Sequence, residues 1–75
     1  MIEINNNNNQ KISCEILFTF NKNNKSFIVY KNNEHDILAS YYKTEGDKTI
    51  ISPIINDEDY DLVDKELEKW WHENE

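Results

Sequence analysis

This sequence of 75 residues is poor in four residue types, and each shortage argues against a class of function. It contains no arginine, one cysteine, one glycine and one proline. Arginine is the side chain that most often reads phosphate groups and guanine through paired hydrogen bonds. Its absence, together with a net charge of -7, argues against direct binding to nucleic acid. A single glycine is too few for a phosphate-cradling loop or a dinucleotide-binding fingerprint.

The single cysteine and the short apolar runs restrict the environment of the protein. One cysteine, Cys14, cannot form an intrachain disulfide or a multi-cysteine metal site. No apolar run approaches the roughly 18 residues of a transmembrane helix, and no cleavable leader is visible. We therefore expect a cytoplasmic protein without a membrane segment.

The length of the chain limits the size of its core. A domain of this length buries only roughly 60% of the surface of its unfolded chain. The aromatic residues, 12% of the sequence, must therefore supply much of the buried area. We expect one domain over residues 1–75. Its expected parts are an edge strand with an asparagine-rich loop (1–10), a β-meander (11–55) and a C-terminal helix (56–72).

Alternation of apolar and polar residues predicts the strands of the meander. Lys11–Phe20 has a period of two, which is typical of a half-buried strand. Its inward face should consist of every second residue: Ile12, Cys14, Ile16, Phe18 and Phe20. The other predicted strands are Ser26–Tyr30, Asp36–Tyr42 and Thr49–Ile55, with a short extra strand at Met1–Ile4. Short polar turns, in which asparagine adopts positive φ, and a loop with Gly46 join successive strands, so the sheet is antiparallel.

Residues 56–72 predict a helix that packs on the sheet. Asn56 is suited to the N-cap, and the acidic residues that follow it suit the positive end of the helix dipole. Four apolar residues recur at helical spacing and should face the sheet: Tyr60, Val63, Leu67 and Trp71. The fold class is therefore α+β, an antiparallel four-stranded meander followed by one packed C-terminal helix.

One helix covers only one face of such a sheet. Five apolar side chains are candidates for the other face: Leu17, Ile28, Tyr30, Leu38 and Tyr42. Two arrangements would cover them. Either the sheet curls into a partly barrel-like ring, or a second copy forms a homodimer through the open sheet face.

Four segments resemble a known family. They are Lys25–Tyr30 (KSFIVY), Ile37–Tyr42 (ILASYY), Ser52–Ile54 (SPI) and Ile55–Leu67 (INDEDYDLVDKEL). With these segments the chain resembles the YrzB-like family, small acidic bacterial proteins classed as a domain of unknown function. The resemblance implies a strand meander with a C-terminal helix, and it implies no activity and no site residues. The asparagine run and the Trp70-Trp71 pair depart from the family pattern.

Charge is unevenly distributed along the chain. Residues 1–56 contain six lysines and six acidic residues, whereas residues 57–75 contain nine acidic residues and two lysines. This acidic helix either keeps a small protein soluble or steers it onto a basic partner. The candidate partner contacts combine helix carboxylates with a small apolar patch beside the predicted stripe: Asp61, Leu62, Asp64, Glu68 and Trp70.

The remaining reactive side chains do not assemble into a chemical site. His35 lies in a predicted turn and His72 follows Glu68 by four residues, which is too few ligands for a metal. Cys14 is expected among inward isoleucines, as a small hydrophobe and not a nucleophile. We therefore expect no catalytic, cofactor or metal site. The sequence favours a non-enzymatic protein–protein interaction or regulatory accessory module with an unknown protein partner. The alternative is a nucleic-acid mimic that occupies the basic groove of a DNA- or RNA-binding protein.

Overall fold

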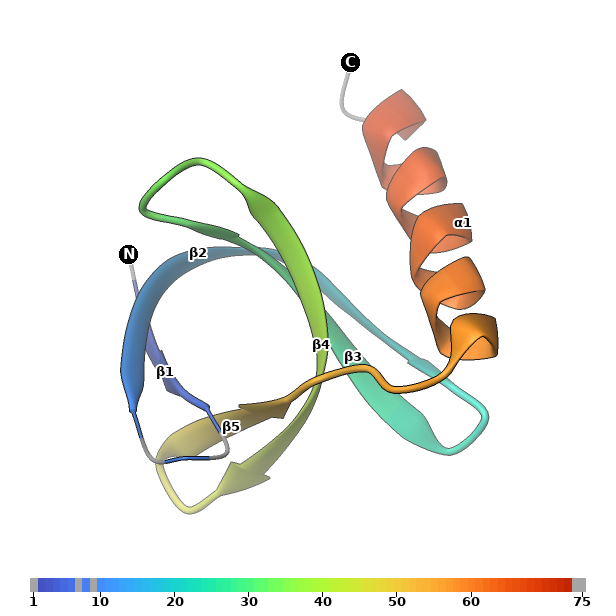
Figure 1. The fold of residues 1–75 in the computed structure, drawn as a ribbon. Coiled ribbons are helices and arrows are strands. Elements are labelled where there is room, and N and C mark those ends of the chain that lie inside the picture. Colours follow the sequence, from blue (N-terminus) through green and yellow to red (C-terminus); the bar gives the residue numbers. More distant parts are fainter. Residues whose placement is uncertain (1, 7, 9, 74–75) are drawn as a thin grey trace.

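The structure, a computed structural model, describes residues 2–6, 8 and 10–73. The described residues form five strands and one helix (Figure 1): β1 (Ile2–Asn5), β2 (Lys11–Lys22), β3 (Lys25–Asn32), β4 (Ile37–Glu45), β5 (Lys48–Ser52) and α1 (Asp57–Glu73). The predicted α+β meander with a short N-terminal strand and a C-terminal helix is confirmed. Met1 of the predicted first strand, and Asn7 and Asn9 of the predicted loop, lie outside the described residues.

The sheet is a meander that curls into a ring. Each strand pairs antiparallel with the next one, and β1 also pairs in parallel with β5. Among the described residues this last contact consists of one residue pair, Asn5 and Ile50, which joins the ring at its seam. The curled arrangement is thus the one that the chain adopts (Figure 1). β1, expected as an edge strand, has a neighbour on each side.

A β-bulge in β2 distributes its side chains between the two faces of the sheet. The pairing register with β3 shifts between Ile16 and Phe18, which makes Leu17 the extra residue. Since side chains alternate along a strand, this extra residue moves Phe18 and Phe20 to the face opposite to Ile16. The prediction that the five alternating residues of this strand share one face is therefore wrong beyond Ile16.

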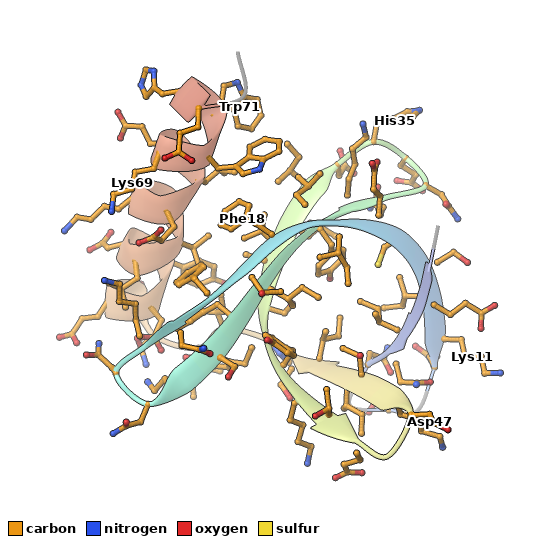
Figure 2. The ribbon with its side chains drawn as sticks, turned by 180° about the vertical axis from the view of Figure 1, so that it is seen from behind. Lys11, Phe18, His35, Asp47, Lys69 and Trp71 are labelled. Carbon is orange, nitrogen blue, oxygen red and sulfur yellow. The ribbon has the colours of Figure 1, made fainter. Side chains whose placement is uncertain are left out.

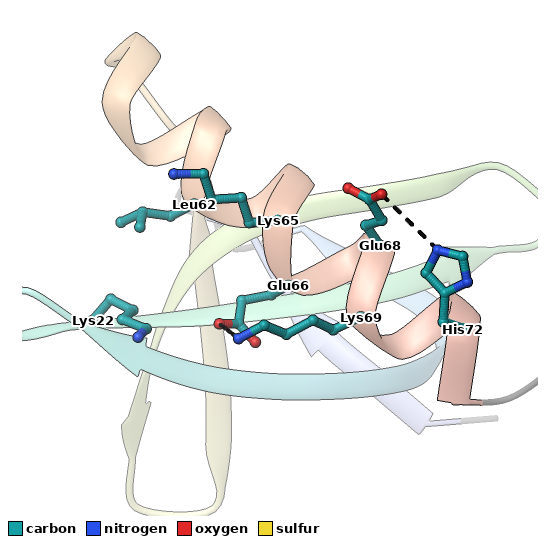
Figure 3. A pocket seen from close by; sticks show the side chains of 7 residues that line it. All are labelled: Lys22, Leu62, Lys65, Glu66, Glu68, Lys69 and His72. Atoms are coloured by element: carbon teal, nitrogen blue, oxygen red, sulfur yellow. Dashed lines mark ion pairs between the residues drawn. The ribbon is translucent and has the colours of Figure 1, made fainter.

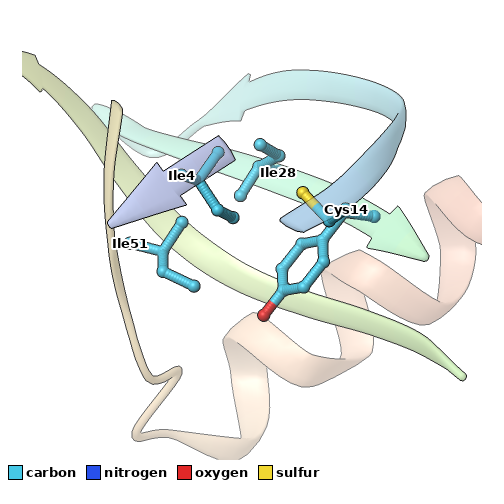
Figure 4. Packing of buried hydrophobic residues seen from close by; sticks show 5 residues of the cluster. Ile4, Cys14, Ile28 and Ile51 are labelled. Carbon is cyan, nitrogen blue, oxygen red and sulfur yellow. The ribbon is translucent and has the colours of Figure 1, made fainter. Parts of the chain in front are cut away.

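The two faces of the sheet produce two apolar clusters. The ring cluster fills the interior of the curled sheet (Figure 4), and its buried members are Ile4, Cys14, Ile28, Tyr30 and Ile51. The helix-side cluster lies between the sheet and α1, and its buried members are Phe27, Val29, Ile54 and Val63. β3 alternates between the two clusters, so four consecutive residues of this strand are buried. Of the five residues predicted for the open face, three contribute to the ring cluster (Ile28, Tyr30 and Tyr42), whereas Leu17 packs against the helix-side cluster and Leu38 is exposed.

The turns follow the conformational preferences of their residues. Asn23 and Asn24 join β2 to β3 with φ of 54° and 63°, a region that asparagine tolerates better than most residues. Gly46, with φ of 58°, starts the two-residue loop between β4 and β5. β5 ends at Ser52, directly before Pro53, because proline has no N–H to donate to the ladder.

The helix starts as predicted but is rotated about its axis relative to the prediction. The Asn56 side chain accepts a hydrogen bond from the Asp59 backbone N–H at 2.9 Å, which confirms Asn56 as the N-cap. Val63 is buried as predicted, whereas Tyr60 and Trp71 are 49% and 45% exposed. The sheet-facing positions that replace these two aromatic residues are Asp59, Leu62 and Trp70. The prediction that Leu62 lies far from the buried face of the helix is therefore wrong.

Candidate functional site

A buried carboxylate fixes the first turn of α1 on the sheet. The Asp59 side chain is almost fully buried, with 2% of the residue exposed. Lys25, the first residue of β3, donates to Asp59 Oδ2 at 2.8 Å, and the Tyr41 hydroxyl of β4 donates a hydrogen bond to the same oxygen. The Lys25 ammonium also lies 5.6 Å from the centre of the Tyr41 ring. One carboxylate thus binds two strands and anchors the helix to both of them.

The three members of this anchor shift each other's acidity. The hydrogen bond from Lys25, and then the one from Tyr41, lower the pKa of Asp59, against the effect of burial. The hydrogen bond to Asp59 raises the pKa of Lys25 and also that of the Tyr41 hydroxyl. The anchor is therefore charged and fully hydrogen-bonded near neutral pH, which suits a structural contact.

Aromatic stacking holds the other end of the helix. The Trp70 ring stacks on Phe18 with 5.8 Å between ring centroids, and Figure 2 shows Phe18 between β2 and α1. The row of rings continues through Phe20 and Phe27 to Tyr41, whose hydroxyl binds Asp59. A continuous aromatic layer therefore links the two ends of α1 beneath the helix.

The proposed partner contacts separate into two groups. Asp61, Asp64 and Glu68 are exposed on α1. Leu62 and Trp70 are half-buried, and they pack against the helix-side cluster and Phe18. In the structure both apolar residues therefore lie in the interface between helix and sheet, while the three carboxylates remain accessible to solvent.

Two adjoining grooves follow β4 on one flank of α1. The first, of about 300 Å³, is lined by residues of β3, β4 and α1: Val29, Ile37, Leu38, Ala39, Tyr60, Val63, Asp64 and Leu67. The second, of about 310 Å³, shares Leu38, Ala39 and Tyr60 with the first and extends toward Pro53 and the end of β5. Leu38 is 40% exposed, so these grooves carry apolar side chains that solvent reaches. We call them together the β4 groove.

The other flank of α1 carries the basic residues of the helix (Figure 3). This groove, of about 530 Å³, is lined by Lys22 of β2 and by six helix residues: Leu62, Lys65, Glu66, Glu68, Lys69 and His72. Lys69 and His72 lie 3.7 Å and 3.9 Å from the carboxylates of Glu66 and Glu68. The side chains of Lys69, Glu68 and His72 are exposed and that of Glu66 is half-buried, so both contacts contribute little to stability. Both lysines of α1 line this flank, and neither lines the β4 groove.

Metal-ligating and nucleophilic side chains are dispersed among the described residues. They include no cluster of three or more histidine, cysteine or acidic side chains that could hold a metal ion. Cys14 is buried in the ring cluster, and burial raises the pKa of its thiol. α1 lacks the combination of length and apolar composition that a membrane-crossing helix needs.

Sequence reasoning missed the anchor and the β4 groove. Asp59 follows the N-cap by three residues and precedes Val63 by four, so its spacing already placed it near the buried face. A stripe defined by apolar residues alone excluded it. Pro53 was the sequence signal that could have indicated the groove. Proline limits the length of the strand that pairs with β4, so one side of part of β4 is left without a neighbouring strand among the described residues.

Comparison with known proteins finds relatives without an assigned role. Residues 7–72 match a family described as a protein of unknown function (DUF1292). A UPF0473 protein of Bacillus pumilus (strain SAFR-032) is 30% identical, over 96% of this chain and 85% of the relative. No solved structure matches the chain. These matches support the expected small bacterial domain of unknown function, while the name YrzB-like is not confirmed.

Proposed function

This chain belongs to the DUF1292 family of unknown function, and we propose that it is a non-enzymatic protein–protein interaction module with a regulatory or accessory role. One observation carries the proposal: exposed aromatic rings and exposed carboxylates share a helix that is anchored at both ends. Tyr60, Asp64 and Trp71 recur at helical spacing on one face, and all three are exposed. This combination suits a partner surface that offers apolar contacts and basic side chains.

The anchoring of α1 supports this reading. A helix tied to the sheet by Asp59 and Trp70 presents its outer side chains in a fixed arrangement. Binding then costs less conformational entropy than binding to a loosely attached helix. The buried contacts of the helix therefore hold its exposed side chains in position for binding.

The test compares two variants that remove the same amount of charge. The helix variant replaces three exposed carboxylates by amides: Asp61→Asn, Asp64→Asn and Glu68→Gln. The control variant makes the same change at three exposed strand positions: Glu3→Gln, Glu15→Gln and Glu45→Gln. Circular dichroism checks that both variants keep the fold.

The partner is captured from the native host with the wild-type chain, identified and purified. We expect it to bind the helix variant at least about tenfold more weakly than wild type, and the control variant within about twofold. Isothermal titration calorimetry measures both affinities. Equal loss in the two variants would indicate a general charge effect, and no loss in either would reject the helix surface.

A second candidate function is favoured by the concentration of charge after residue 56. In this alternative the acidic segment mimics nucleic acid in the basic groove of a DNA- or RNA-binding protein. Lys65 and Lys69 interrupt the acidic surface of α1, and we therefore rank the mimic second. The affinity of a mimic would fall steeply from low to high salt, whereas contacts through Tyr60 and Trp71 would largely persist.

A further inference from the structure

Half of β4 has an open edge. Ile37–Tyr41 pairs with β3 on one side of this strand. β5 covers the other side only from Tyr41 to Glu45, so none of the described strands pairs with that side from Ile37 to Ser40. β5 cannot extend along this edge, because its last residue is followed by Pro53.

The β4 groove runs along this open edge. Leu38 and Ala39 are consecutive strand residues, so their side chains point to opposite faces of the sheet. Both nevertheless line the same two grooves, together with Tyr60 of α1. A groove that reaches side chains on both faces follows the edge between them. β4 thus forms one wall of the groove, α1 forms the opposite wall of its first part, and residues 51–54 line its second part.

The edge lacks the residues and the bulge that often protect a strand against pairing. Natural sheets block exposed edges with lysine, proline or a bulge. The segment Ile37–Ser40, with the sequence ILAS, contains no lysine or proline, and its pairing with β3 is regular. An apolar, regular and open edge is the feature that strand-adding partners use.

We propose that an extended segment of a partner protein binds in the β4 groove as an additional strand beside Ile37–Ser40, with apolar residues at alternate positions and a lysine or arginine facing Asp64. This inference rests on the proposed function and specifies the mode of binding. Backbone hydrogen bonds to β4 supply affinity, and the alternating side chains supply specificity through contacts with Leu38, Tyr60 and Leu67.

Charge distinguishes this occupant from a second copy of the chain. Asp64 is the one charged side chain among the described residues that line the β4 groove. A basic residue of the partner would pair with this carboxylate. A second copy would instead bring its own acidic helix beside the first, and like charges across an interface oppose association.

The experiment uses the full-length chain and short synthetic peptides with capped ends. The first peptide alternates valine and threonine and has one central lysine, and the second has glutamate in place of lysine. We expect the lysine peptide to shift the backbone amide signals of residues 37–40 in NMR spectra and to slow their hydrogen exchange. We expect the glutamate peptide to bind at least about tenfold more weakly.

Three variants sharpen the test. Leu38→Lys places a charge on the exposed edge and should reduce binding of the lysine peptide about tenfold or more. Asp64→Lys should reverse the preference, so that the glutamate peptide binds more tightly than the lysine peptide. Glu73→Lys is the matched control, because Glu73 is exposed on the same helix but does not line the groove, and the affinity of this variant for the lysine peptide should stay within about twofold of wild type.

Three results would overturn the inference. If the lysine peptide shifts only signals of the helix surface, strand addition is wrong while the interaction module stands. If no signal shifts at the solubility limit of the peptide, strand addition is also wrong, and the capture experiment decides separately on the proposed function. If sedimentation finds a wild-type dimer that Leu38→Lys dissociates, the edge belongs to a second copy and not to a partner.

Discussion

Lys25 and Asp59 are joined by an ion pair of 2.8 Å that crosses the interface between β3 and α1. The lysine side chain is partly exposed, whereas the carboxylate is buried and also accepts a hydrogen bond from Tyr41. This arrangement sets the rotation of the helix, because the carboxylate must face the sheet to keep its two partners. Tyr60, the next residue, is consequently turned toward solvent and the β4 groove.

Replacing Asp59 by asparagine should destabilise the fold. Lys25 and Tyr41 would lose the carboxylate that both of them bind, and the amide accepts a charged donor less strongly. We expect the melting temperature at pH 7 to fall by several degrees, since a small domain shifts by about 4–8 °C per kcal/mol. Asp61→Asn is the control and should leave it nearly unchanged. Thermal unfolding monitored by circular dichroism measures the melting temperatures of both variants. Equal decreases for Asp59→Asn and Asp61→Asn would contradict the anchor.

The anchor also predicts how stability depends on pH. The pKa of Asp59 is lowered in the folded state by Lys25 and Tyr41, while in the unfolded chain it takes its ordinary value of about 3.9. The resulting stabilisation is complete above that ordinary value and is lost as pH falls through the lowered one. The stability difference between wild type and Asp59→Asn should therefore be constant above about pH 5 and shrink below about pH 4. Urea unfolding at several pH values tests this, and a difference that grows on acidification would contradict it.

The two neighbouring tryptophans should differ in their contribution to stability. Trp70 stacks on Phe18, whereas Trp71 contacts the Trp70 ring at its edge and is about half exposed. Trp70→Ala should cost about 2 kcal/mol or more, toward the range of buried aromatic truncations, and Trp71→Ala less than about 1 kcal/mol. Urea unfolding of the two variants provides the comparison. A larger loss for Trp71→Ala would mean that the helix has a different rotation.

Cys14 should tolerate alanine better than serine. Its side chain is fully buried in the ring cluster, where a serine hydroxyl would lose contact with water among apolar neighbours such as Ile4 and Ile28. We expect Cys14→Ser to be less stable than Cys14→Ala by about 1–3 kcal/mol, the cost of burying an unpaired polar group. In the wild type, an aromatic disulfide reagent should modify the thiol only as fast as the ring opens. Rapid modification of the native protein would contradict its burial.

The turn between β2 and β3 should depend on the residue at position 24. Asn24 has φ of 63°, a conformation that costs most residues with a Cβ atom about 1–2 kcal/mol. Asn24→Ala should therefore destabilise the domain by about 1 kcal/mol, whereas Asn24→Gly should be neutral or stabilising, because asparagine followed by glycine is preferred in such turns. Urea unfolding separates the two outcomes, and equal stability of both variants would exclude turn strain as the cause.

Local signals account for the elements that sequence analysis predicted well. The Asn56 cap reaches only three residues along the chain, and the asparagine turn spans two residues between adjacent strands. Preferences at this distance depend on neighbouring residues alone, so they are readable before the fold is known. Short loops between strands likewise limit the sheet to an antiparallel meander.

The candidate site was predictable only in part. Helical spacing already separates Asp61, Asp64 and Glu68 from Val63, and these three carboxylates are exposed. The exposure of Tyr60 and Trp71 was not foreseen, because an apolar stripe was assumed to choose the buried face. That choice was made instead by Asp59, whose partners lie 34 and 18 residues away.

The sequence by itself determined the strand and turn pattern, the capped helix and the concentration of negative charge on it. Only the tertiary structure decided that Leu17 forms a bulge, that Asn5 and Ile50 bring the ring together, and that no described strand pairs with one edge of β4 from Ile37 to Ser40. The physical reason is the range of the interactions. Propensity and capping act within a few residues, whereas strand register, sheet curvature and the partner of a buried carboxylate depend on segments that meet only after folding.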